Sequence, residues 1–175
     1  MIQTPRLLVR PWCDADRAAF AAMGRDPEVM RYLGPLMTRA DSDAGVDRML
    51  AAQARDGFCF WAVEQRDDGA FVGFCGLKRV DFAGVLNGTV EIGWRLRRES
   101  WGLGLASEAA RAVCDWGFAN GLARIVSFTA TGNLASQRVM QRIGMVRRAD
   151  LDFDHPVLAA GDPLRRHVVY DIEPA

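Results

Sequence analysis

A chain of 175 residues with 50% hydrophobic and 25% charged residues has the composition of a folded domain, which excludes a disordered or fibrous chain. The 22 basic and 22 acidic side chains cancel, so bulk charge gives no reason to expect nucleic acid or an anionic membrane as the main partner. No apolar run approaches the roughly 20 residues of a membrane-spanning helix, and we expect a soluble protein.

The N-terminal segment predicts a strand followed by two helices. Residues 6–12 alternate in polarity and the run is closed by a proline, which is typical of a short edge strand. Asp14 stands where it would cap a following helix. Residues 26–33 predict a second, short helix, because Pro27 suits a first helical turn.

Thr38 or Asp41 is expected to begin a third helix, and Gly57 gives its stop signal. Beyond residue 57 the pattern changes from helical to alternating. Strands and helices then follow in this order: strands 58–65, 70–80 and 89–96, a helix through 106–117, strand 124–129, helix 133–142, and strands from 145 and over 165–172. This order predicts a mixed α/β fold, and we expect one domain over residues 1–175.

A glycine turn between a predicted strand and a predicted helix is the most informative segment. Gly102 and Gly104 have no side chains, so a ligand can approach the main chain closely. The unpaired N–H groups at the start of the helix lie at the positive end of its dipole, which predicts a site for an anion such as pyrophosphate. No lysine follows the glycines, which excludes a P-loop. A dinucleotide fingerprint needs a third glycine or alanine where Ser107 stands. A simple tight turn is the remaining alternative.

A second motif lies downstream of this turn. Residues 133–145, NLASQRVMQRIGM, follow the pattern N-x-x-S-x-x-V-[LM]-x-[KR]-x-G-[FM], and residues 99–106 follow E-x-x-G-x-G-x-A. With TPRLLVRPW at 4–12 and EIGWRL at 91–96, these motifs resemble the GNAT superfamily of N-acyltransferases. Within it, the chain looks like the RimJ/RimL branch of ribosomal-protein N-terminal acetyltransferases. The resemblance covers nearly the whole chain.

This resemblance implies a GNAT fold in which two central parallel strands, 89–96 and 124–129, splay apart and hold acetyl-coenzyme A. The pantetheine arm is then expected along the main chain of Ile92, Gly93 and Trp94. The pyrophosphate is expected on the N–H groups of Trp101, Gly102, Leu103, Gly104, Leu105 and Ala106. Asn133 is expected to reach the coenzyme, although a role as helix cap alone would explain it.

Two side chains are candidates for catalysis. Glu91 lies on the strand expected to hold the thioester, where a carboxylate would accept the amine proton through water. A structural ion pair with Arg95 or with an arginine across the sheet is the alternative. Many GNAT relatives have a tyrosine seven residues after the motif asparagine as the acid for the thiolate, but this chain has Met140 there. The resemblance then implies Ser136 as that acid, although a serine in a first helical turn is also ordinary.

The acceptor is expected to be a primary amine, either a protein N-terminus or a small molecule, acetylated directly in a ternary complex. Tyr32 on the second short helix and His155 in the loop 152–156 are expected to line the acceptor site, with an exposed loop histidine as the alternative for His155. A non-catalytic sensor of acyl-coenzyme A is the other function considered, because Met140 replaces the tyrosine. Whether the chain forms a homodimer stays open.

The cysteines predict no metal site and no thiol chemistry. No C-x-x-C pair occurs among Cys13, Cys59, Cys75 and Cys114. With only two histidines in the chain, we expect no bound metal. Each cysteine has apolar neighbours, which favours a small buried side chain. Reduced thiols without a secretory signal favour a cytoplasmic protein.

Overall fold

The computed structural model describes residues 1–174 and joins their strands in one mixed sheet. The predicted domain extends to residue 175, which lies outside the described part. The strand order is β1-β2-β3-β4-β5-β6-β9-β7, and β8 also pairs with β9. The strands are β1 (Ile2–Gln3), β2 (Leu7–Arg10), β3 (Phe60–Gln65), β4 (Phe71–Arg79), β5 (Val90–Leu96), β6 (Ile125–Ala130), β7 (Val146–Arg147), β8 (Phe153–Asp154) and β9 (Arg166–Ile172). The predicted mixed α/β fold is confirmed.

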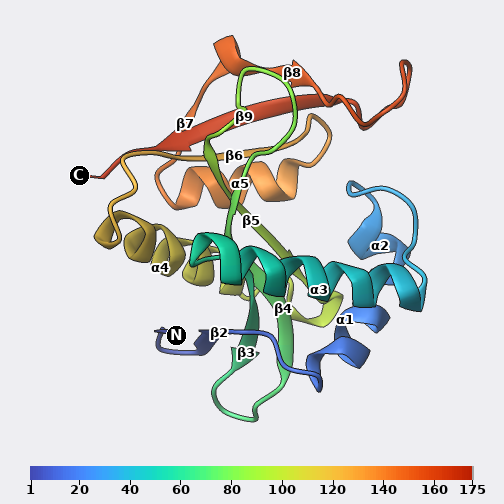
Figure 1. Ribbon diagram of the computed structural model, residues 1–175, viewed down its shortest axis with the longest axis vertical. Coiled ribbons are helices and arrows are strands. Elements are labelled where there is room, and N and C mark those ends of the chain that lie inside the picture. Colours follow the sequence, from blue (N-terminus) through green and yellow to red (C-terminus); the bar gives the residue numbers. More distant parts are fainter. Residues whose placement is uncertain (175) are drawn as a thin grey trace.

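Five α-helices surround this sheet in the described residues: α1 (Asp16–Gly24), α2 (Pro27–Met30), α3 (Arg39–Asp56), α4 (Leu105–Ala119) and α5 (Leu134–Arg142). Figure 1 shows β6, β7, β8, β9 and α5 at one end of the molecule, and β2, β3 and α1 at the other. None of the helices in residues 1–174 is long and apolar enough to cross a membrane.

Residues paired across the central strands show which helix covers which face. Trp61 of β3 and Trp94 of β5 both lie opposite Cys75 of β4, so the three side chains share one face of the sheet. The Trp61 ring contacts Trp116 of α4, with ring centroids 4.9 Å apart. Alternation turns the next residues to the other face. There Phe74 of β4 meets Phe20 of α1, with centroids 6.1 Å apart. Helices α4 and α1 therefore cover opposite faces of the sheet.

The long helix α3 is capped at both ends by the predicted residues. The hydroxyl of Thr38 accepts a hydrogen bond from the N–H of Asp41, and the Asp41 carboxylate accepts one from the N–H of Thr38. Both candidate residues thus take part in a capping box. Gly57 ends the helix with φ of 80°, a conformation that favours glycine.

The first helix begins differently from the prediction. Helix α1 follows Ala15, which has no capping side chain, and the Asp14 side chain is 98% exposed. The carboxylate of Asp16, inside the first turn, instead accepts a hydrogen bond from the N–H of Cys13. Burial alone would raise the pKa of Asp16, but hydrogen bonds from Arg10 and Cys13 lower it. The prediction of Asp14 as the cap was therefore wrong, because a buried ion pair fixes Asp16 at that place.

Strand β2 is an interior strand, whereas the sequence predicted an edge. Ile2 of β1 lies opposite Val9 on one side, and Gln65 of β3 lies opposite Leu7 on the other. Pro11 follows the last residue of β2 and ends it. The two-residue strand β1 is too short to give a periodic signal in the sequence, so it was not recognised. Strand β2 was therefore taken for the edge of the sheet.

The two parallel strands β5 and β6 diverge soon after they meet. Glu91 and Val126 are their single register pair in the described residues, and the Ser127 hydroxyl donates to the carbonyl of Ile92 at 3.0 Å. Past this point β5 stays paired with β4 as far as Leu96. The side of β5 that faces β6 is therefore left without a strand partner beyond Ile92, as the splayed arrangement requires.

Candidate functional site

The turn that follows β5 presents a row of unpaired N–H groups. Gly102 and Gly104 have φ of 75° and 78°, which only glycine adopts readily. Within residues 1–174, no partner accepts from the N–H groups of 102–107, whereas the next one, of Glu108, donates to the Gly104 carbonyl. A Cβ added at Gly102 would have no atom within 4 Å. The turn thus presents unpaired main-chain amides to open space at the positive end of α4.

Trp101 contributes differently from the prediction. Its N–H donates to the Arg98 carbonyl at 3.1 Å, so the free amides begin at Gly102. The Trp101 indole N–H donates to the Leu96 carbonyl at 2.9 Å, while 46% of the residue stays exposed. Trp101 therefore anchors the turn to the end of β5 and leaves a flat ring beside the amides. The contact of the Trp101 N–H with a pyrophosphate stays a prediction.

The N-terminal segment clamps this turn, which sequence reasoning missed. The carboxylate of Glu108 accepts from the Thr4 hydroxyl at 2.6 Å, the Arg6 N–H at 3.0 Å and the Arg6 Nε at 2.7 Å. The Arg6 Nη1 donates to the Leu103 carbonyl at 2.9 Å. Arg6 thereby places a guanidinium, about half exposed, beside Gly104. Because this guanidinium is ion-paired with Glu108, it holds the turn in place without adding net charge to it.

Asn133 and Ser136 lie together at the start of α5. The Asn133 Oδ1 accepts from the N–H of Ser136 at 3.2 Å, as a helix cap does. The Nδ2 group donates to the Thr129 hydroxyl at 2.9 Å and to the Ser136 hydroxyl at 3.1 Å. These bonds account for the buried Asn133 as a structural residue. They also leave Ser136 with its hydroxyl hydrogen free to donate, because its oxygen is used as an acceptor.

Met140 and Tyr32 have different environments. Met140 is 1% exposed and lies in the main core, so nothing at this position reaches a reacting group. Tyr32 follows α2 and packs against the segment before α5: a Cβ added at Gly132 would lie 3.3 Å from the Tyr32 ring. The fold thus places Tyr32 beside Gly132, the residue before Asn133, although Tyr32 lies 100 residues earlier in the sequence. Its contact with an acceptor stays a prediction.

Glu91 is partly buried at the point where β5 and β6 part. It lies opposite Val126 of β6 and Lys78 of β4. Burial raises the pKa of Glu91 to about 7; the charge of Lys78 counteracts the rise, and that of Asp81 adds to it. Lys78 pairs with Asp81 at 3.5 Å, and in the described residues no arginine pairs with Glu91. A carboxyl group with a pKa near neutrality and no ion pair is suited to accept a proton.

His155 belongs to an aromatic cluster and is not the exposed loop residue of the alternative. Its ring centroid lies 4.9 Å from that of Phe82 and 5.0 Å from that of His167. Burial lowers the pKa of His155, and the charges of His167 and Lys78 lower it further. Val126, the register partner of Glu91, belongs to the same apolar cluster as Phe82, which lies beside His155, so Glu91 borders this cluster. Whether His155 touches an acceptor is untested by this geometry.

Three of the four thiols are buried and have little nucleophilic character. Burial raises the pKa of Cys59 and Cys114 to about 12 and that of Cys75 well above its usual value. Cys13 is exposed, which corrects the prediction that all four are buried. The error arose because its apolar neighbours in sequence point elsewhere in the fold. In residues 1–174, no group of three His, Cys, Asp or Glu side chains is placed to hold a metal ion.

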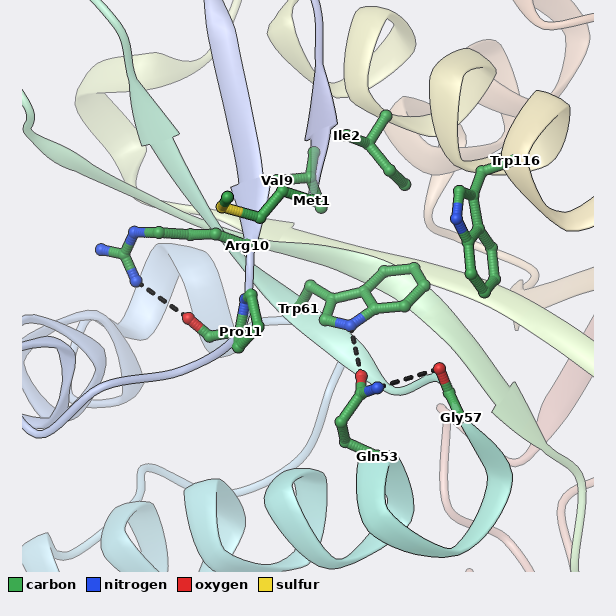
Figure 2. Close-up of a pocket in the computed structure, with 9 residues that line it drawn as sticks. All are labelled: Met1, Ile2, Val9, Arg10, Pro11, Gln53, Gly57, Trp61 and Trp116. Atoms are coloured by element: carbon green, nitrogen blue, oxygen red, sulfur yellow. Dashed lines mark hydrogen bonds between the residues drawn. The ribbon is translucent and has the colours of Figure 1, made fainter.

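A small cavity lies apart from the predicted site. Its volume is about 110 Å³, and it is lined by Met1, Ile2, Val9, Arg10, Pro11, Gln53, Gly57, Trp61 and Trp116. Figure 2 shows the Trp61 indole donating to Gln53, whose amide nitrogen donates in turn to Gly57. None of the predicted site residues lines this cavity. It is a packing feature between α3, α4 and the first strands.

Comparison with known proteins agrees with this geometry. The family model described as "Acetyltransferase (GNAT) domain" matches residues 6–146. The chain is 34% identical over 145 residues to "Uncharacterized protein YkkB" of Bacillus subtilis, covering 81% of this chain and 83% of the relative. It is 31% identical over 155 residues to "Uncharacterized N-acetyltransferase YoaA" of the same species, covering 86% and 85%.

Solved structures share the fold. A GNAT-family acetyltransferase from Bacillus anthracis superposes with a TM-score of 0.81 at 28% identity, covering 98% of this chain and 97% of that one. The RimL ribosomal L7/L12 α-N-protein acetyltransferase, in complex with coenzyme A, superposes with a TM-score of 0.76 at 15% identity, covering 97% of this chain and 95% of that one. At this identity the likeness shows the fold alone. With a matching family model over most of its length and relatives above 30% identity, the chain belongs to the GNAT acetyltransferase family.

Proposed function

We propose that the protein transfers the acetyl group of acetyl-coenzyme A directly to a primary amine. The observation that carries the proposal is the row of unpaired amides at 102–107, in the turn that follows the strand that parts from β6. A diphosphate suits the amides, and a pantetheine arm suits the unpaired side of β5. No second function has an observation of its own in its favour.

The residues present fit the coenzyme. The N–H groups of Gly102, Leu103, Gly104, Leu105 and Ala106 would hold its pyrophosphate, and the guanidinium of Arg6, ion-paired with Glu108, would keep the turn in place. The main chain of Ile92, Gly93 and Trp94 would hold the pantetheine arm. Asn133 would support this site mainly by fixing Ser136. When bound, acetyl-coenzyme A supplies an activated acetyl thioester.

The chain's own groups have different parts in the transfer. Glu91 takes the proton that the amine loses, through a water molecule, because its pKa of about 7 lies close to the working pH. The Ser136 hydroxyl would donate a hydrogen bond to the sulfur and so stabilise the departing thiolate, which takes its proton from solvent. A main-chain N–H near Trp94 polarises the acetyl carbonyl. The buried, high-pKa thiols offer no nucleophile for a covalent route, which supports direct transfer in a ternary complex.

Two classes of acceptor amine are compatible with the family likeness and the charge of the chain. A resemblance to the RimJ/RimL branch favours a protein N-terminus, and the balanced charge of the chain leaves a small amine equally open. We propose that Tyr32 and His155 line the acceptor side. The coenzyme and the amine are the partners proposed.

The decisive experiment joins binding to turnover. Calorimetric titration with coenzyme A should give a saturable signal at one site per chain. Incubation with acetyl-coenzyme A and a broad panel of amines and peptides should release free thiol with at least one acceptor. Absence of coenzyme A binding would refute the proposal. Binding without thiol release on any amine would favour a sensor instead.

A further inference from the structure

Trp101 is the exposed tryptophan of the described chain, with 46% of the residue accessible to solvent. The other four have cover, because Trp12 and Trp61 are buried and Trp94 and Trp116 pack against the main core. Trp101 belongs to neither apolar cluster of the described chain, and none of the stacked rings or cation–ring pairs found there includes it. The indole is therefore an aromatic surface that the rest of the fold leaves uncovered.

The Trp101 ring is nevertheless held in one orientation. Its indole N–H donates to the carbonyl of Leu96 at 2.9 Å, and its main-chain N–H donates to the carbonyl of Arg98 at 3.1 Å. Fixing a side chain costs conformational entropy, which burial of the ring offsets only in part. An indole anchored at its polar end and open over its apolar surface is typical of a binding surface. A ligand that stacks on such a ring loses little further freedom of the protein.

The place of Trp101 in the turn indicates which ligand it suits. Single exposed apolar side chains are common in folded proteins, so exposure alone predicts no ligand. Trp101, however, directly precedes the unpaired amides of 102–107, which the proposed function assigns to a diphosphate. A Cβ at Gly102 would have no atom within 4 Å, and Leu103 is 56% exposed, so the surface beside the ring is open. An aromatic ring next to a diphosphate suits the base of the same nucleotide, because every base has a π-face.

The ring also lies at the end of β5 that is far from Glu91. Leu96, which accepts the indole hydrogen bond, is the last residue of the strand. At about 3.3 Å per residue, Leu96 lies roughly 16 Å from Glu91 along β5. The proposed function places the reacting thioester at the Glu91 end, with the pantetheine arm between. The opposite end of the coenzyme is its nucleoside, and Trp101 lies toward that end.

We infer that Trp101 is a binding residue for the nucleoside end of the coenzyme and stacks on its adenine base. This rests on the proposed function and deepens it, because it names the group that distinguishes a complete coenzyme from an acetylated pantetheine arm. An acetyl thioester of pantetheine without a nucleoside is then a poor donor. Trp101 takes no part in the acetyl transfer itself.

The test removes the nucleoside from the ligand and the ring from the protein separately. Calorimetry measures the dissociation constants of coenzyme A and of pantetheine 4′-diphosphate, which keeps both phosphates and lacks the nucleoside. Loss of the nucleoside should weaken binding to the wild type by a factor about 5- to 150-fold larger than in Trp101→Leu. A turn loosened by the substitution would weaken both ligands alike, since both carry the diphosphate, so the ratio reports the base.

Outcomes for the two proposals are distinguishable. Equal ratios in the wild type and Trp101→Leu would overturn the inference and leave the proposed function standing. Absence of saturable coenzyme A binding by the wild type would refute the proposed function, and the inference with it. Dephospho-coenzyme A, which lacks only the 3′-phosphate, is the ligand control and should lose the same affinity in both proteins. Leu50→Ala, at a 38% exposed apolar residue of α3, is the protein control and should keep the wild-type ratio.

A further variant and a spectroscopic signal separate stacking from a structural role. Trp101→Phe keeps an aromatic face but loses the hydrogen bond to Leu96, so its ratio should lie nearer to the wild type than to Trp101→Leu. A ratio equal to that of Trp101→Leu would assign the effect to the hydrogen bond and overturn the inference. Coenzyme A should quench the Trp101 emission, measured as the difference between the wild type and Trp101→Phe, whereas pantetheine 4′-diphosphate should not. Equal quenching by both ligands would contradict stacking on the base.

Discussion

Glu91 combines a position on the splayed strand with a pKa of about 7 set mainly by burial. If it is the base, it must be ionised to work, so kcat/KM should fall as the pH drops through about 7. Glu91→Gln should lower kcat/KM by about 10²- to 10⁴-fold and remove this limb of the pH profile. The limb that remains should be that of the acceptor amine, whose pKa lies higher.

Neighbouring charges provide a graded check of this assignment. Asp81 raises and Lys78 lowers the pKa of Glu91, so Asp81→Asn should move the limb to lower pH and Lys78→Met to higher pH. Glu173→Gln, at an exposed site beyond β9, serves as the control and should leave the profile unchanged. If the fall of kcat/KM at low pH persists in Glu91→Gln, another group is the base.

Ser136 is the residue for which activity and stability should separate most clearly. Ser136→Ala removes the free hydroxyl hydrogen but keeps the main-chain bond to Asn133, and Asn133 keeps its bond to Thr129. We expect turnover to fall several-fold or more while the unfolding free energy changes little, within about 1.5 kcal/mol for one side-chain hydrogen bond. Steady-state kinetics and urea unfolding measure the two. Unchanged turnover would remove Ser136 from the mechanism.

At the level of elements, the glycine turn joins backbone strain to binding. Gly102 has φ of 75° with open space above it, and an alanine there should cost about 1–2 kcal/mol of stability. The same substitution should weaken coenzyme A binding, because relaxing φ turns the amides away from their common centre. Gly161→Ala is the matched control, since Gly161 has φ of 86° and no atom near its missing Cβ. It should lose similar stability and keep full affinity; equal affinities in both variants would show that the turn holds no ligand.

The same elements show what local sequence predicts well. The turn, α4, α5 and the capping box of Thr38 depend on neighbours within a few residues, and each was located correctly. Pairing of β1 with β2 and the clamp on Glu108 join residues that lie far apart in sequence, and neither was foreseen. Trp101 was considered only for its main-chain N–H, because the exposure of its ring becomes visible once its neighbours have been placed in three dimensions.

At the scale of the whole molecule, the proposed ligand would contact β5, the turn before α4 and the start of α5. Ligand that binds only the folded state stabilises it by mass action, by about 2.7 kcal/mol at 100 times the dissociation constant. For a chain of this size we expect coenzyme A to raise the Tm by about 5 to 10 °C. Thermal unfolding at several coenzyme concentrations measures this. A Tm that does not depend on concentration would contradict binding at the fold's centre.

The global arrangement was predictable in class but not in detail. The mixed sheet followed from the alternation of strands and helices, and the two central parallel strands followed from the family motifs, whereas the order of the other strands in the sheet was not predicted. The aromatic cluster around His155 and the register that sets Lys78 opposite Glu91 came from pairings across the sheet. These pairings decide the electrostatics of the site, so its chemistry could be outlined from the sequence but its charges could not.

Glu108 draws its partners from residues 4–6, and this has a practical side for anyone who prepares the protein. A truncated version that starts at Leu7 would strip the first turn of α4 of its clamp and leave a carboxylate facing the phosphate-binding amides. Residues 4–6 should therefore be kept in any shortened version, whereas an affinity tag ahead of Met1 has room, because Met1 is 89% exposed.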